Sequence, residues 1–279
     1  MAQIHPMAVV DKKADLAADV VVGPFAYIGP HVRLGAGCVV EHHASIEGHT
    51  QAGTGNHFFS YCQVGTVPQD LKYRGGPCQV VIGNDNNIRE HVTIHIGTED
   101  GGGRTQVGSH NLLMIGMHVA HDCIIGDYCQ LANQVLLAGH IVVEDRAVVA
   151  GGVAIHHFVT VGRNSFVGGT SGVVHDVPPF MVVNGHPAEV CGFNRTGLKR
   201  SGFSDAAVEA IRHAYRVLFK KGSPVAVALK ELEDLYPDVP EIQELVAFIR
   251  RSSDGKFGRY RECLREKAFQ DSQDSTLAT

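Results

Sequence analysis

Five histidines lie within one stretch in the middle of the chain: His118, His121, His140, His156 and His157. Asp122 directly follows the second of them. An imidazole that titrates near neutral pH can remove a proton from a hydroxyl group when another group orients its second ring nitrogen. Asp122 or a backbone carbonyl can orient His121 in this way. Any one of these histidines alone is most simply read as a hydrogen-bonded surface residue, but the cluster indicates general-base catalysis.

A repeat of six residues predicts the elements that position this cluster. Every sixth residue from Val107 to Val173 is aliphatic, and mostly Gly, Ala or Glu follow these positions. An α-helix would repeat its apolar face at three and four residues and a single strand at two, whereas six is the period of a hexapeptide β-helix. The same rhythm runs from Ile4 to Val64 and resumes at Ile82. The sequence therefore predicts a mainly β protein built as a parallel β-helix.

The repeat also predicts which site residues stack on one another. In this repeat class three hexapeptides make one coil, so residues eighteen apart lie about 4.8 Å apart, which is the strand spacing of a sheet. Two adjacent columns result, the first of His121, Gly139 and His157 and the second of Asp122, His140 and Phe158. A glycine N–H beside a general base is a suitable donor to the oxyanion of acyl transfer. We therefore expect acyl transfer, with Gly139 as that donor.

Two other chemistries compete with direct acyl transfer. Zinc binding needs three converging ligands, and Gly162 stands where hexapeptide zinc enzymes have the histidine that would complete a set with His121 and His157. A covalent acyl-enzyme needs a nucleophile paired with the base, and Cys123 occupies a small-residue corner position instead. We therefore expect no metal and no other cofactor, and favour transfer in one step.

Two segments interrupt the repeat, and a helical pattern follows it. Residues 66–79 place polar and glycine residues where aliphatic ones are due, and residues 97–106 shift the phase by one position. Such loops often carry function in solenoids, although a tolerated surface insertion explains either one alone equally well. We predict a β-helix over residues 1–190 with these two loops, and a small α-helical domain with a polar tail over residues 191–279.

Three helices are expected in the C-terminal region. Ser204 is the predicted N-cap of a helix from Asp205 to Lys220, because its hydroxyl can accept from an unpaired N–H of the first turn. Pro224 is the predicted first residue of the second helix, and the third runs from Pro240 to Arg251. A short fourth helix is expected over residues 260–269.

Composition narrows the function classes. The chain has 279 residues and a net charge of −5, which gives no general indication of nucleic-acid or anionic-membrane binding. Seven cysteines form no CxxC pair and are expected to be reduced core residues, as in a cytosolic protein. No secretory signal and no apolar run of membrane-spanning length is evident. We expect a cytoplasmic protein.

A set of short segments resembles the UDP-N-acetylglucosamine O-acyltransferases of lipid A biosynthesis. The matching segments are Gly23-Pro24-Phe25, Gln69-Asp70-Leu71-Lys72-Tyr73, Ile88-Arg89-Glu90, Val92-Thr93-Ile94-His95, Asn111-Leu112-Leu113-Met114-Ile115, His118-Val119-Ala120-His121-Asp122-Cys123, Leu137-Ala138-Gly139-His140, Gly168-Gly169 and Gly197-Leu198-Lys199-Arg200. The resemblance covers residues 4–203 and, more loosely, the helices. The first loop and the histidine segment carry it, because the repeat alone also occurs in acetyltransferases, nucleotidyltransferase tails and scaffolds.

The resemblance implies a left-handed β-helix that forms a homotrimer with active sites between subunits. It implies transfer of an (R)-3-hydroxyacyl chain from acyl carrier protein to the glucosamine 3-hydroxyl of UDP-N-acetylglucosamine, the first step of lipid A biosynthesis. In this interpretation His121 is the general base, Asp122 orients it, and the Gly139 N–H stabilises the oxyanion. The residues that would bind substrate are Asp70, Lys72, His95, His118, His140, His156, Gly169, Asn194 and Arg200. Gly169 lies where the family gauges acyl length, so we expect room for a long chain of roughly twelve to fourteen carbons.

Four positions depart from the family pattern: Ile96, His157, Thr196 and Ser201. Several of them lie near the expected sugar and nucleotide sites, so an N-acyltransferase that acts on a 3-amino-sugar nucleotide is an alternative. A non-catalytic trimeric scaffold is another, which the intact His121-Asp122 pair disfavours. A coenzyme A-dependent transferase of small acetyl groups is disfavoured by the first loop and by Gly169.

Overall fold

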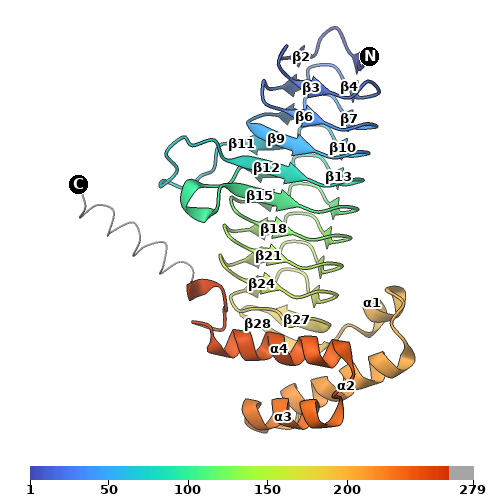
Figure 1. Ribbon diagram of the computed structural model, residues 1–279, viewed down its shortest axis with the longest axis vertical. Coiled ribbons are helices and arrows are strands. Elements are labelled where there is room, and N and C mark those ends of the chain that lie inside the picture. Colours follow the sequence, from blue (N-terminus) through green and yellow to red (C-terminus); the bar gives the residue numbers. More distant parts are fainter. Residues whose placement is uncertain (264–279) are drawn as a thin grey trace, which may run out of the picture.

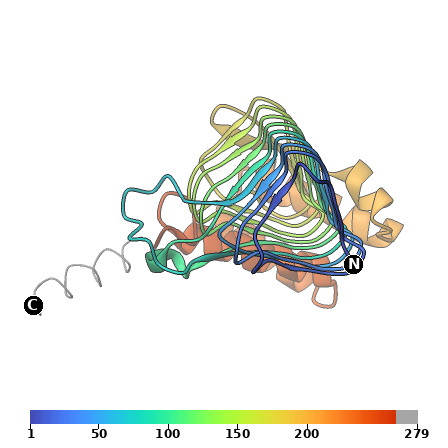
Figure 2. The ribbon, with the colours of Figure 1, turned by 90° about the horizontal axis from the view of Figure 1, so that it is seen from above.

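The computed structural model describes residues 1–263, in which the chain winds into a long triangular prism of parallel strands that is closed at one end by helices (Figure 1). Viewed along its axis, the prism has three flat sides and three corners (Figure 2). This is the left-handed parallel β-helix followed by helices that the sequence predicts. Three of the four C-terminal helices were expected, and α1 (Arg195–Arg200) was not. The short helix expected over residues 260–269 and the polar tail lie largely outside the described residues.

Three sheets form the sides of the prism, and each coil contributes one strand to each sheet. All their strands pair in parallel except β28, which is antiparallel to β27 at the end of the first sheet. The first sheet contains β1 (Gln3–Ile4), β4 (Val21–Val22), β7 (Val39–Val40), β10 (His57–Phe58), β13 (Asn87–Ile88), β16 (Leu112–Leu113), β19 (Gln130–Leu131), β22 (Val148–Val149), β25 (Phe166–Val167), β27 (Met181–Gly185) and β28 (Ala188–Phe193). The second contains β2 (Val9–Val10), β5 (Tyr27–Ile28), β8 (Ser45–Ile46), β11 (Gln63–Thr66), β14 (Thr93–His95), β17 (His118–Val119), β20 (Leu136–Leu137), β23 (Ala154–Ile155) and β26 (Gly172–Val173). The third contains β3 (Asp15–Leu16), β6 (Arg33–Leu34), β9 (His49–Ala52), β12 (Gln79–Ile82), β15 (Arg104–Val107), β18 (Ile124–Ile125), β21 (Val142–Val143) and β24 (Thr160–Val161).

The period of six arises because successive strands begin six residues apart, and most of them are two residues long with one side chain pointing into the prism. Every sixth residue from Val107 to Val173 is buried, at 0 to 3% exposure. Strands β17, β20 and β23 pair with a register of eighteen residues, so that Val119 lies beside Leu137 and Leu137 beside Ile155. Burial of such an aliphatic side chain contributes roughly 1.5–3 kcal/mol, so each coil adds three such increments to one continuous core.

Many corners require an unusual backbone conformation. One residue of such a corner has a positive φ, as in Asp122 (φ 59°), His140 (φ 64°) and Phe158 (φ 64°). Asn, Asp and His adopt this left-handed conformation more readily than other non-glycine residues. These three residues stack along the corner between the second and third sheets, because the backbone N–H of His140 donates to the His121 carbonyl and that of Phe158 to the Gly139 carbonyl.

Two excursions leave the prism on the same side, as both views show (Figures 1 and 2). The first connects β11 to β12, which begins at Gln79. The second connects β14 to β15 and contains the 3₁₀ helix η1 (Glu99–Gly101). Strand β15 already includes residues 104–106 of the range expected for this loop. Arg74 in the first excursion pairs with Asp100 in the second at 3.0 Å, which joins the two segments.

The C-terminal helices have a core of their own at the end of the prism. They are α1 (Arg195–Arg200), α2 (Asp205–Phe219), α3 (Val225–Leu235) and α4 (Pro240–Asp254). The predicted cap of α2 is confirmed, since Ser204 accepts from the N–H of Ala207. Pro224 is the N-cap of α3 and not its first residue, because its ψ of 138° is extended. None of the helices within residues 1–263 is long and apolar enough to cross a membrane.

Candidate active site

The centre of the site is a chain of hydrogen bonds through His121 and Asp122. The His121 Nδ1 lies 2.8 Å from the Asp122 Oδ2. The same oxygen accepts from the Thr98 hydroxyl at 2.6 Å, and the other carboxylate oxygen accepts from the Thr98 N–H at 3.0 Å. Because an ionised carboxylate can only accept hydrogen bonds, the His121 Nδ1 carries the proton and its Nε2 has a free lone pair. This is the tautomer that a general base requires.

Asp122 is held in place by one threonine of the second excursion and one of strand β15. Its side chain is almost completely buried, at 1% exposure, whereas that of His121 keeps 15%. Thr98 is the N-cap of η1, and the Thr105 hydroxyl accepts from the backbone N–H of Asp122 at 2.9 Å. The residues of this excursion were predicted to form a candidate functional loop, but neither threonine was predicted to contact Asp122. The contact of Thr98 depends on how the loop folds back onto the corner.

Gly139 lies directly beneath the His121 ring, as the eighteen-residue stacking predicts. A Cβ atom on Gly139 would lie only 2.5 Å from the His121 Cε1 and 2.7 Å from its Nε2. The Gly139 N–H makes no hydrogen bond to any other of residues 1–263. The Gly139 N–H is therefore a free donor beneath the His121 ring, a suitable group to stabilise an oxyanion in acyl transfer.

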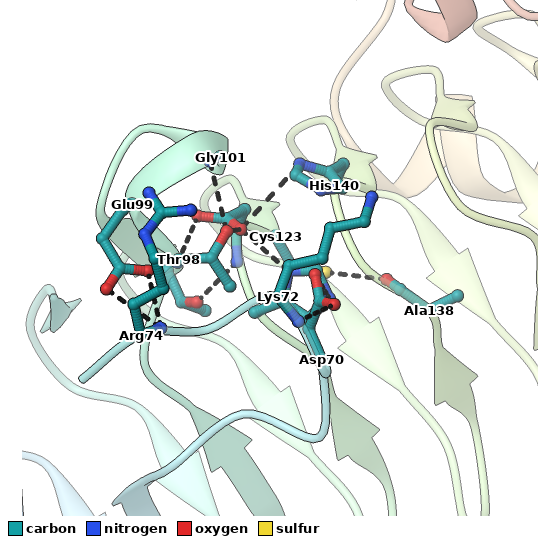
Figure 3. A network of polar contacts seen from close by, with 12 residues as sticks. Asp70, Lys72, Arg74, Thr98, Glu99, Gly101, Cys123, Ala138 and His140 are labelled. Carbon is teal, nitrogen blue, oxygen red and sulfur yellow. Dashed lines mark hydrogen bonds and ion pairs between the residues drawn. The ribbon is translucent and has the colours of Figure 1, made fainter. Parts of the chain in front are cut away.

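The first excursion closes over the same corner (Figure 3). Its Asp70 carboxylate lies 3.8 Å from the His121 Nε2 and accepts from the backbone N–H of Lys72. The Lys72 side chain is exposed and points away from the backbone of this loop (Figure 3). The loop therefore brings an acidic side chain, that of Asp70, next to the nitrogen that would act as base, and carries a basic one two residues further on.

Two further predicted residues line the side of the second sheet next to His121. The His118 Nδ1 lies 2.7 Å from the Thr93 hydroxyl, and the His95 and His118 rings meet edge to face at 4.7 Å. His95 is buried, and its Nδ1 has no hydrogen-bond partner among residues 1–263. A buried imidazole nitrogen without a partner is costly, so His95 has a free nitrogen to offer a bound substrate.

Burial keeps the histidines around the base neutral. It lowers the pKa of His95 to about 4, with the neighbouring His118 and His121 acting in the same direction. It also lowers the pKa of His118, and that of His140 to about 4. A positive charge on His121 would therefore meet neutral imidazoles.

These lowered pKa values predict a loss of stability in acid. In the unfolded chain a histidine titrates near 6.5. Between about pH 6.5 and about pH 4 the unfolded state therefore binds protons that His95 and His140 do not bind in the folded state, and the lowered pKa of His118 acts in the same direction. For each such proton the free energy of unfolding decreases by up to about 1.4 kcal/mol for every pH unit that the pH is lowered, and there is no effect above about pH 6.5. Urea unfolding of wild type and of His95→Gln across this range measures the difference, and equal slopes would contradict the assignment to His95.

The remaining predicted residues lie elsewhere on the monomer. The His156 Nδ1 bonds to the His157 carbonyl at 3.0 Å, one coil beyond His140 on the same corner. Gly169 is exposed on the opposite edge of the second sheet, between β25 and β26. Asn194 is the N-cap of α1 and bonds to Asn164, at the third corner, and Arg200 is exposed at the end of α1. Figures 1 and 2 place α1 on the side of the prism away from the two excursions.

The four unusual positions have different environments. Ile96 is buried and lines a cavity of about 390 Å³ at the base of the first excursion, together with Gly48, Tyr73 and Cys78. His157 packs against His156, with ring centroids 3.8 Å apart. The Ser201 hydroxyl accepts from Asn164, and Thr196 is exposed on α1.

Among residues 1–263, two groups of ligand atoms lie close enough together to hold a metal ion: His121, Asp122 and His140, and His156, His157 and Glu262. In the first group the carboxylate of Asp122 is already engaged by the Thr98 hydroxyl, the Thr98 N–H and His121. These hydrogen bonds favour the interpretation as a base and its orienting group over a metal centre.

Comparison with known proteins places the chain among enzymes with the chemistry that this geometry suggests. A family model described as Udp N-acetylglucosamine O-acyltransferase, Domain 2, matches residues 176–257. LpxA from Acinetobacter baumannii is 41% identical, with a TM-score of 0.84 over 87% of this chain and 95% of that one. LpxA from Bacteroides fragilis, a UDP-N-acetylglucosamine acyltransferase, is 38% identical, with a TM-score of 0.86 over 89% of this chain and 97% of that one. The UDP-N-acetylglucosamine acyltransferase of Francisella novicida is 36% identical, with a TM-score of 0.86 over 89% and 91%.

Proposed function

Because the chain belongs to the UDP-N-acetylglucosamine O-acyltransferase family, we propose that it transfers an (R)-3-hydroxyacyl chain from acyl carrier protein to the glucosamine 3-hydroxyl of UDP-N-acetylglucosamine, the first step of lipid A biosynthesis. The observation that carries the proposal is the hydrogen-bond chain from Thr98 through Asp122 to His121 above the free N–H of Gly139. We expect the reaction to take place in the cytoplasm.

The site residues have distinct roles in this reaction. The His121 Nε2 removes the proton of the sugar hydroxyl, whose oxygen attacks the thioester carbonyl. The Gly139 N–H donates to the oxyanion of the tetrahedral intermediate. Collapse of this intermediate breaks the carbon–sulfur bond, and His121 returns its proton to the leaving thiolate of the carrier protein. Asp122 stabilises the imidazolium formed between these two proton transfers.

Substrate contacts come from both excursions and from the second sheet. Asp70 and Lys72 bind the sugar and phosphates from the first excursion, and His95 offers its free Nδ1 to the same ligand. His118, His140 and His156 complete the wall around the base. In this arrangement the buried, neutral imidazoles act as hydrogen-bonding groups and not as charges.

The site is completed by a second subunit of a homotrimer. Gly169, Asn194 and Arg200 lie at the two corners of the prism that do not carry His121. A single rigid prism cannot bring residues from three different corners into one site. A neighbouring copy packed against the corner that contains His121 can place its own Gly169, Asn194 and Arg200 there. A cleft between subunits also gives a long acyl chain the apolar enclosure that the filled interior of the prism lacks.

The test is an incubation of the purified protein with UDP-N-acetylglucosamine and a ladder of 3-hydroxyacyl carrier-protein thioesters, with products identified by mass. An O-acylated nucleotide sugar is expected, with a preference for long chains. If only the 3-amino analogue is acylated, the N-acyltransferase alternative replaces the proposal. If neither sugar is acylated, the proposal fails, and the non-catalytic trimeric scaffold is the remaining alternative.

The acyl length is expected to depend on Gly169. Its added Cβ would lie 3.4 Å from the Gly151 carbonyl oxygen, an ordinary contact, and Gly169 is exposed, so a side chain fits there and would extend outside this corner. A Gly169→Met side chain would fill that space and should lower the rate with a donor of about fourteen carbons by about tenfold or more, while a donor about four carbons shorter is used as well as before. Chain-length profiles of both proteins measure this, and an unchanged profile would remove Gly169 as the ruler.

A further inference from the structure

The segment that follows α4 folds back onto the β-helix beside the catalytic corner. The Asp176 N–H donates to the Gly258 carbonyl at 2.8 Å, and its carboxylate accepts from the N–H of Tyr260 at 2.8 Å. Arg259 and Glu262 are buried, at 6% and 3% exposure, and pair with each other at 3.1 Å. Both views show this red segment on the side of the prism where the two excursions lie (Figures 1 and 2). Residues 255–262 are therefore fixed against the coils that carry the site.

Arg261 extends from this fixed segment to the corner that contains Gly139. Its guanidinium donates to the His140 carbonyl. The His140 N–H in turn donates to the His121 carbonyl at 3.1 Å. The guanidinium, the Gly139-His140 corner and the backbone of the base are thus connected by consecutive hydrogen bonds. A shift of this corner would move both the Gly139 N–H and the surface on which the His121 ring rests.

Arg261 also adds a permanent positive charge beside the His140 ring. The groups that face this ring are Asp122, at 3.9 Å, His121, with ring centroids 5.0 Å apart, and Phe158, stacked at 4.5 Å. The pKa of His140 is lowered chiefly by burial, then raised in part by Asp122, and lowered again by His121 and Arg261. Asp70 acts more weakly in the direction of Asp122. The guanidinium offsets the carboxylates that would otherwise attract a proton to His140.

We propose that Arg261 is a positioning residue of the active site, which holds the Gly139-His140 corner against the base and keeps His140 a neutral hydrogen-bonding group. The inference rests on the proposed function, because its effect on rate is an effect on acyl transfer. It assigns the folded-back segment 255–262 a role in catalysis that none of the sequence motifs indicates.

Arg261→Ala should lower kcat by about tenfold to a hundredfold and change KM by less than about threefold, since the corner is displaced but the substrate contacts remain. Arg261→Lys keeps the charge but not the planar fork, and should recover part of kcat. NMR titration of ring-labelled histidine should show the pKa of His140 raised in Arg261→Ala and close to the wild-type value in Arg261→Lys. The matched control is Arg250→Ala, which removes a surface pair with Glu233 and should leave kcat and the His140 titration unchanged.

Unchanged kcat and an unchanged His140 titration in folded Arg261→Ala would overturn the inference. If Arg261→Ala does not fold, Arg261→Gln retains a donor of similar reach without the charge, and it should raise the pKa of His140 while preserving more of kcat. If wild type itself transfers no acyl chain, the proposed function fails. The His140 titration then still decides whether Arg261 keeps that ring neutral.

Discussion

Replacing His121 by alanine should lower the rate of acyl transfer by about a hundredfold to ten-thousandfold, the range expected for loss of a general base. His121 is the imidazole whose Nδ1 is bonded to the ionised Asp122, at 2.8 Å, so that its Nε2 is left as an acceptor. The neighbouring His118 and His140 are not hydrogen-bonded to a carboxylate in this way. His118 bonds to the Thr93 hydroxyl, and the His140 Nδ1 lies 3.9 Å from the Asp122 carboxylate. Neither can take over the role.

The measurement is the initial rate of formation of acylated UDP-N-acetylglucosamine for wild type and His121→Ala at saturating substrate. The matched control is His110→Ala, because His110 also lies at a corner of the prism, with a φ of 59°, but stacks on Tyr128 away from the site. Both variants remove an imidazole from the β-helix surface, so a comparable loss of stability is expected in each. A rate of His121→Ala within tenfold of the control would remove His121 as the base.

The hexapeptide repeat made the β-helix predictable from the sequence, because every sixth residue is an aliphatic side chain that points into the core. The stacking of Gly139 beneath His121 was predictable for the same reason, since a register of eighteen residues follows from three strands per coil. The family resemblance is confirmed by solved structures that are 36–41% identical to this chain. Where the repeat is uninterrupted, the position of a residue in the sequence therefore predicts its coil and its neighbours in the adjacent coils.

What could not be predicted lies where the chain leaves the repeat. Thr98 reaches Asp122 only because η1 turns the second excursion back onto the corner. Arg261 reaches His140 across 121 positions of sequence through a segment with no periodic pattern. Such contacts depend on the path of an irregular backbone, and no residue type or spacing in the sequence records that path.

Substitution of Gly139 should have the second large effect on the rate, because the absence of a side chain at this position leaves room for the His121 ring. The His121 ring rests over the Gly139 Cα and is held there by Asp122. An added methyl group would come within 2.5 Å of the His121 Cε1, which is closer than real contacts allow. The methyl group cannot move, because the Gly139 carbonyl is bonded to the N–H of Phe158 in the next coil. The ring must therefore leave Asp122 or tilt away from the substrate.

Gly139→Ala should therefore lower kcat by about a hundredfold, the cost of displacing a catalytic group by about 1 Å. Stability should change little, because the crowded partner is a side chain at the surface of the site. The matched control is Gly192→Ala in β28, where an added Cβ meets its nearest atom at an ordinary 3.7 Å. Steady-state kinetics and thermal unfolding of both variants separate the two effects. Full activity in Gly139→Ala would show that the base tolerates a shift away from Asp122, and that its position above Gly139 is not what makes it catalytic.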